Sequence, residues 1–150
     1  MLRDWHSANV RWSLTYPEIY EVGSSNLGHI ILYSILNAVP GQLCDRAYLP
    51  AADLATRLRE QEQPLFAVES RRPLPAFDIL GFSLSYELGA TNILEMLDLC
   101  RVPIRAADRG DLPLGDPPSP PLIFAGGPPA TSNREPYAAF FDFIALGDGE

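Results

Sequence analysis

Small uncharged residues gather where apolar runs of this sequence end, and these are the places where the chain could bind a ligand. The first such run, at 10–16, is followed by a loop that contains Gly23, Ser24, Asn26 and Gly28. Glycine lets the backbone approach a phosphate or a ring edge, and serine or asparagine supplies hydrogen bonds at a helix start. A turn that only caps a helix explains the same residues equally well.

The run at 77–85 also ends in small polar residues. Ser83 and Ser85 stand at its end. Small hydroxyls at a strand tip can bond a ligand's amide or phosphate. They can also cap the helix that follows, and for Ser85 we expect this capping role.

The run at 122–127 ends in two adjacent glycines. Gly126 and Gly127 are followed directly by Pro128. Two glycines in series leave a strand tip without side chains, so that something flat and bulky can lie against it. Since a tight turn alone seldom needs both, we interpret this pair as functional.

No catalytic or metal-ligating set can be defended from the sequence. The chain has two histidines and two cysteines, Cys44 and Cys100, and no C-x-x-C pair. Neither a Ser/His/Asp nor a Cys/His arrangement is supported by the spacing. We therefore expect two buried structural thiols, no metal site and no catalytic residue in this chain.

Composition indicates a soluble globular domain. The chain has 150 residues, 47 % of them hydrophobic and 20 % charged, and its net charge is −8. That length can bury a real core. The negative charge disfavours binding to nucleic acid or to an anionic membrane, and no apolar run is long enough to span a bilayer. Because the N-terminus has no apolar signal-peptide core, we expect a cytoplasmic protein.

The alternation of apolar runs with helical patterns predicts an α/β fold. Strands are expected at 10–16, 43–49, 77–85, 122–127 and 141–148, with weaker strand patterns at 65–70 and 102–108. Helices are expected at about 26–39, 51–63, 86–101 and 134–141, and a proline-rich loop at 109–121. This order predicts a three-layer, Rossmann-like or flavodoxin-like domain with a mostly parallel five-stranded sheet and helices on both faces. In such sheets ligands bind beyond the carboxyl ends of the strands.

The expected helices differ in their apolar faces. The helix at 51–63 should turn Leu54 and Leu58 inward. The helix at 26–39 carries one apolar face, formed by Leu27, Ile30, Ile31, Ser34, Ile35 and Ala38. The helix at 86–101 has residues that suit a core face, namely Leu88, Ile93, Met96, Leu97 and Cys100.

Four stretches carry a resemblance to a known family: YPEIYEVGSSNLGHIILYSILN, ESRRPLPAFDILGFSLSYELGATNILEMLDL, IRAADRG and AGGPPATSNREPYAAFFDFIALGDGE. Together they resemble the N-terminal segment of radical S-adenosylmethionine (radical SAM) proteins that contain a cobalamin-binding domain. In that family the Gly-Gly-Pro stretch closes the cobalamin-type domain. The Gly-Asp-Gly-Glu stretch precedes a helix and then a barrel with a three-cysteine iron–sulfur motif.

The resemblance implies one cobalamin-binding-like domain over residues 1–150, truncated before the barrel. The 4Fe-4S cluster, the S-adenosylmethionine and the Fe-S oxidoreductase chemistry would belong to that barrel, which would be the domain's partner in the same parent chain. The 150-residue chain alone would then be non-catalytic. The expected cofactor-binding residues are Gly23, Ser24, Asn26, Gly28, Ser83, Ser85, Gly126, Gly127 and Pro128.

The sequence departs from the family at the lower ligand of the cobalt. The Asp-x-His-x-x-Gly pattern that supplies this histidine reads here Glu21-Val22-Gly23-Ser24-Ser25-Asn26. Cobalamin would therefore bind without a histidine from that motif. The alternative is a degenerate, non-binding interaction module with the same fold, which could also pair with a second copy through an exposed sheet edge. A nucleotide or flavin domain is the weakest reading, because no phosphate-loop signature is present.

Overall fold

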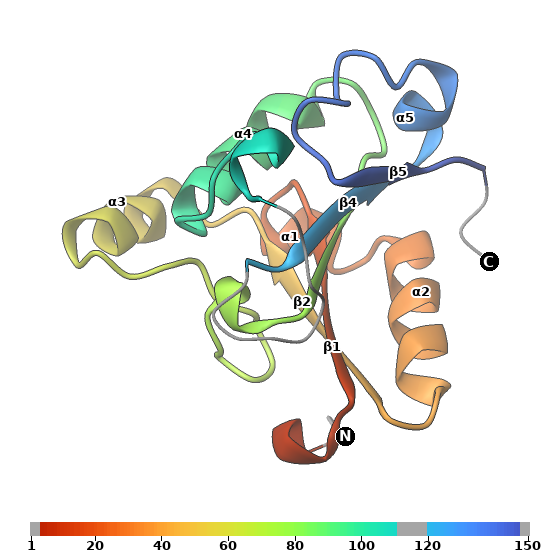
Figure 1. Cartoon of the computed structure of the whole chain (residues 1–150). Coiled ribbons are helices and arrows are strands. Elements are labelled where there is room, and N and C mark those ends of the chain that lie inside the picture. The colour runs from red at the N-terminus through yellow and green to blue at the C-terminus, as the bar shows by residue number, and fades with distance from the viewer. Residues whose placement is uncertain (1–3, 111–119, 148–150) are drawn as a thin grey trace.

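Five parallel strands form one sheet in the computed structural model, which describes residues 4–110 and 120–147. The strands are β1 (Val10–Tyr16), β2 (Gln42–Tyr48), β3 (Ile79–Ser83), β4 (Leu122–Gly126) and β5 (Phe143–Ala145). Their order across the sheet is β2-β1-β3-β4-β5, and all neighbours run parallel (Figure 1). The predicted α/β class and parallel sheet are confirmed. The strand order reverses between β1 and β3, so the switch-point crevice lies at their carboxyl ends.

Short helices connect the strands. They are α1 (Tyr20–Gly23), α2 (Leu27–Ala38), α3 (Ala52–Glu60), α4 (Gly89–Leu99) and α5 (Pro128–Ser132), with 3₁₀ turns at Trp5–Ser7, Leu74–Ala76 and Ala106–Asp108. Asn26, one of the two residues (with Ser25) that could cap this helix, is its N-cap, because its side-chain oxygen accepts the backbone N–H of His29 at 3.0 Å. Within residues 4–110 and 120–147, no helix has the length and apolar character that crossing a membrane requires.

Helices α3 and α4 lie on one face of the sheet (Figure 1). Side chains alternate between the two faces along a strand, and on this face Leu80, Phe82 and Ile123 are almost completely buried. They pack in one cluster with Leu58 of α3 and with Met96 of α4. This cluster is the hydrophobic core of the domain.

The opposite face is covered only in part. Helix α2 lies on this side of the sheet, against β1 and β2 (Figure 1). The register places Leu14, Gly81, Phe124 and Phe143 in one row across β1, β3, β4 and β5. The predicted apolar face of α2 points outward rather than into the core, and its Leu27 is 69 % exposed.

An aromatic row (Trp12, Phe124 and Phe143) lies across this half-covered face. The rings of Trp12 and Phe124 meet edge to face with centroids 6.3 Å apart. The rings of Phe124 and Phe143 are stacked at 4.8 Å. Phe143 is still 46 % exposed, so the outer end of the row remains open to solvent.

Several sequence-based expectations were wrong. The segment 65–70 forms only an isolated bridge from Phe66 to Pro73, and 102–108 contains a 3₁₀ turn instead of a strand. The helix expected at 134–141 is a series of turns at 135–140. The short helix between β4 and β5 lies earlier in the chain, at Pro128–Ser132. Leu88 is 80 % exposed and does not join the core. Most of the proline-rich loop, and Asp148, Gly149 and Glu150 of the Gly-Asp-Gly-Glu stretch, lie outside the described residues.

Candidate functional site at the carboxyl edge of the sheet

A hydrogen-bonded group of side chains occupies the switch point between β1 and β3. The hydroxyl of Tyr16, the last residue of β1, donates to the Ser85 hydroxyl at 3.2 Å. The same oxygen accepts the side-chain amide of Asn26 at 3.1 Å. Ser85 does not cap α4, whose N-cap residue is Leu88. Two of the predicted site residues, Asn26 and Ser85, are therefore joined through a tyrosine that sequence reasoning did not single out.

The glycines of this edge fall into two kinds. A Cβ on Gly23 would come within 2.7 Å of the Tyr48 ring and 2.8 Å of the Tyr16 ring. A Cβ on Gly127 would lie 2.1 Å from the carbonyl oxygen of Leu84, and the φ of Gly127 is +129°. Packing within the chain accounts for both of these glycines.

Gly28 and Gly126 have more room. Around a Cβ on Gly28 the nearest atom is the Asn26 side-chain oxygen at 3.5 Å, and around one on Gly126 it is the Ala145 Cβ, also at 3.5 Å. In register, Gly126 pairs with Ser83 of β3 and with Ala145 of β5. The result is a small-residue row (Ser83, Gly126 and Ala145) at the carboxyl end of the half-covered face.

The remaining predicted site residues have local roles. The backbone N–H of Ser24 donates to the Tyr20 carbonyl at 2.9 Å and closes α1. Pro128 is the first residue of α5, where proline is well tolerated because that N–H needs no partner within the helix. All nine predicted residues lie near the carboxyl edge. They divide between the β1–α2 side and the ends of β3 and β4.

His29 is a polar residue of this edge that the sequence analysis missed. It is 1 % exposed and lies between the rings of Tyr16 and Tyr48, with centroids 5.5 and 5.6 Å away. Neither imidazole nitrogen has a hydrogen-bond partner. Burial, helped by the nearby positive charge of Arg46, lowers the pKa of His29 to about 4. The imidazole is therefore neutral at pH 7.

An ionic group lies along β2. The carboxylate of Asp45 is fully buried, and the Arg46 guanidinium is bonded to Glu69 through its Nε at 2.7 Å. The guanidinium also lies over the Tyr33 ring of α2, 4.7 Å from the centroid. The sequence did carry a signal for this group, because Asp45 and Arg46 interrupt the otherwise apolar run at 43–49.

The two cysteines are free and buried, as expected. Burial raises the pKa of both thiols far above the usual range, so neither is a nucleophile at neutral pH. Among the described residues, no group of three or more histidine, cysteine or acidic side chains could hold a metal ion.

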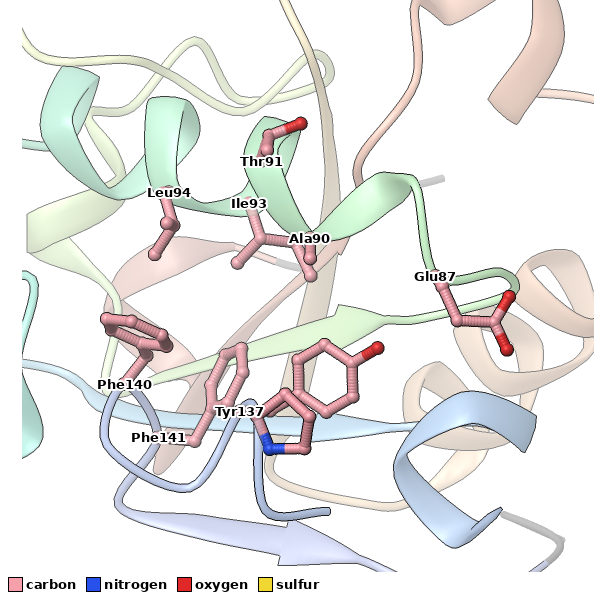
Figure 2. Close-up of a pocket in the computed structure, with 9 residues that line it drawn as sticks. Glu87, Ala90, Thr91, Ile93, Leu94, Tyr137, Phe140 and Phe141 are labelled. Carbon is pink, nitrogen blue, oxygen red and sulfur yellow. The ribbon is translucent and has the colours of Figure 1, made fainter. Parts of the chain in front are cut away.

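An apolar pocket of about 340 Å³ lies on the α4 side of the sheet. Figure 2 shows Leu94, Ile93 and Ala90 of α4 facing the rings of Tyr137, Phe140 and Phe141, with Glu87 set apart from them. The pocket lies next to the turns at 135–140, which take the place of the helix expected there. None of the nine predicted site residues lines it.

Replacing Gly127 tests whether packing accounts for this glycine. We expect Gly127→Ala to destabilise the domain by about 3 kcal/mol, since the new Cβ meets a backbone carbonyl and the φ is one that only glycine adopts readily. The matched control, Gly28→Ala, should be neutral or stabilising by about 0.5 kcal/mol. Urea unfolding of both variants measures this, and equal stabilities would contradict the assignment.

Removing His29 should change how stability depends on pH. A buried histidine with a lowered pKa favours the folded state above pH 6.5, and this contribution is lost as the pH falls toward 4. As the pH falls through that interval, the free energy of unfolding of His29→Leu should therefore rise relative to that of the wild type, by up to about 1.4 kcal/mol per pH unit. Thermal or urea unfolding between pH 4 and 8 checks this. Wild-type and variant curves that stay parallel would contradict it.

Comparison with known proteins gives one match. A family model described as "Radical SAM proteins, N-terminal" matches residues 28–150. No curated protein sequence matches the chain, and neither does any solved structure. The matched span includes the four strands β2 to β5 and α2 from its second residue onward, and it leaves out β1.

Proposed function

Because this chain belongs to the family of radical SAM N-terminal domains, we propose that it is a non-catalytic docking domain. Its half-covered sheet face would pack against the remainder of a radical SAM protein. The observation that carries the proposal is the aromatic row on β1, β4 and β5, which lies on the same side of the sheet as the outward apolar face of α2.

The physical argument starts from the sheet. Parallel sheets occur almost only with both faces covered, and in the part of the chain that the structure describes α3 and α4 cover one face while α2 covers the other only over β1 and β2. Phe143, Ile35 and Leu27 are 46, 45 and 69 % exposed. Large exposed apolar side chains gathered on one side of a domain mark a surface that another element covers.

The carboxyl edge supports a role in binding rather than in catalysis. Tyr16, Asn26 and Ser85 satisfy one another, and His29 is enclosed by aromatic rings. These groups supply hydrogen bonds and packing contacts, and we assign none of them a proton-transfer role. In this proposal the radical chemistry belongs to the barrel of the parent protein.

Introducing a negative charge at exposed apolar side chains tests the docking role. The chain should bind the separately produced radical SAM domain of a family member. Phe143→Glu and Ile35→Glu should each weaken this binding at least tenfold, because a charge on the covered face would be desolvated. Isothermal titration calorimetry measures the affinities.

Thr56→Glu is the matched control, since Thr56 is exposed on α3 at the opposite face. It should bind as the wild type does. An absence of binding by the wild-type chain, or one affinity shared by all variants, would overturn the docking proposal.

Cobalamin is the second candidate, and one observation favours it. The small-residue row leaves room beside α2 for a flat group. A cobalamin held through a histidine does not fit the described residues of this edge, because His29 is buried between two rings. If cobalamin binds, Ser83, Gly126 and Ala145 would line its site without a ligand below the cobalt.

A titration with hydroxocobalamin separates this second candidate from docking alone. Saturable binding with a shift of the visible absorbance would support it, and Gly126→Leu should then weaken binding at least tenfold by filling the small-residue row. The control is Thr56→Glu on α3, at the opposite face of the sheet, which should leave binding unchanged. An unchanged spectrum at a large excess of hydroxocobalamin would remove cobalamin binding by this chain.

A further inference from the structure

Residues 66–72 run along the outer edge of β2. In the strand order β2 stands at one end of the sheet, so its free edge would present unpaired backbone groups. The backbone N–H of Val68 donates to the carbonyl of Arg46 at 2.8 Å. Within the segment, the N–H of Ala67 donates to the Arg72 carbonyl at 2.9 Å and closes a turn. The segment therefore covers the edge strand.

A buried carboxylate holds this segment to the strand. Asp45 of β2 accepts three backbone N–H groups, from Arg46 at 2.7 Å, from Glu69 at 3.1 Å and from Ser70 at 2.8 Å. Two of these donors belong to the covering segment. Because Asp45 is fully buried, losing these bonds would leave a charge without compensation.

A second carboxyl group converges on the same place. Glu69 accepts the backbone N–H of Arg46 at 3.0 Å, so this one N–H is shared between Glu69 and Asp45. The Arg46 guanidinium is the cation that bonds to Glu69 here. A fully buried and a partly buried carboxyl group thus converge on one backbone N–H, and such a pair retains a proton more readily than two separate carboxylates.

The titration of the pair follows from this arrangement. Burial, together with contact with Asp45, raises the pKa of Glu69 to about 7. Burial also opposes ionisation of Asp45, but hydrogen bonds from Glu69 and Ser70 outweigh it and lower the pKa of Asp45. The titratable and charged groups that interact with Glu69 come from β2 and α2, and they are Asp45, Arg46, Cys44, Tyr48 and Tyr33.

We infer that residues 66–72 form a proton-held cover over the outer edge of β2. The cover is closed while the Asp45–Glu69 pair retains one proton and loosens when that proton leaves. With the proton in place, the pair carries one negative charge, and the Arg46 guanidinium beside it carries one positive charge. Without it, two carboxylates face one guanidinium, and opening lets Glu69 reach water.

The direction of the pH dependence is fixed by this scheme. In the open form Glu69 is an ordinary carboxyl group with a pKa near 4.5, while the closed form keeps its proton up to about pH 7. The closed form therefore binds more protons between these values. Opening becomes easier as the pH rises through this interval, by up to about tenfold per pH unit, and levels off above pH 7.

Amide hydrogen exchange measured by NMR tests the inference on the chain itself. The amides of Val68, Glu69 and Ser70 report on the cover, and that of Leu80 in β3 reports on global unfolding. After correction for intrinsic exchange rates, protection of the three cover amides should fall at least tenfold between pH 5 and pH 7.5. Because global unfolding also releases Glu69 into water, Leu80 is compared by its level of protection: it should stay more strongly protected than the three cover amides at every pH, which shows that they exchange by local opening.

Glu69→Gln supplies the matched variant, because glutamine imitates the protonated carboxyl group in size and charge. It should flatten the pH dependence of the cover amides, whereas Glu95→Gln, which changes a more exposed acid on α4, should leave it as in the wild type. Protection that is constant with pH in the wild type would overturn the inference. A slope that persists in Glu69→Gln would also overturn it.

Discussion

The packing of α3 and α4 on one face of the sheet is the interaction on which the rest of the structure depends. It buries Leu80, Phe82 and Ile123 together with Leu58 and Met96. Each large apolar side chain buried in this way contributes about 1.5–3 kcal/mol. The same core includes Leu43 and Ala47 of β2. It therefore joins strands on both sides of β1 and can fix the strand order without help from the opposite face. The opposite face is then free to stay partly uncovered.

The sequence was sufficient for the fold class because apolar strands and helices alternate along it. The periodicity of the helix at 26–39 also identified the apolar side chains of α2 correctly, but it could not say that this face points outward. Periodicity reports which residues share a face and carries no information about whether the parent structure covers it. The turns at 135–140 were missed for a related reason, since Tyr137 is buried there without forming part of a helix.

The candidate site was predictable by position and not by role. Parallel topology brings strand ends to one edge, so all nine predicted residues lie close to it. The reason for Gly127 depends on the carbonyl of Leu84, which belongs to a different strand end. His29 was missed because its burial results from two tyrosines at the ends of β1 and β2. Contacts between distant segments decide both roles, and no local pattern contains them.

The two halves of the half-covered face differ in what they can accept. Over β1 and β2, the space below α2 is filled by Tyr16, Tyr48 and His29, and the outer edge of β2 is covered by residues 66–72. Over β3, β4 and β5, the same face presents the aromatic row and the small-residue row.

A docked protein element and a bound cofactor would therefore use the same half of this face. They compete for it unless the cofactor lies between the two proteins. In that arrangement the partner would complete the cofactor site, so binding of one would strengthen binding of the other by the same factor. Residues 66–72 cover the β2 edge, and α2 lies over β1 and β2. Both the docked element and the cofactor would therefore bind over β3, β4 and β5.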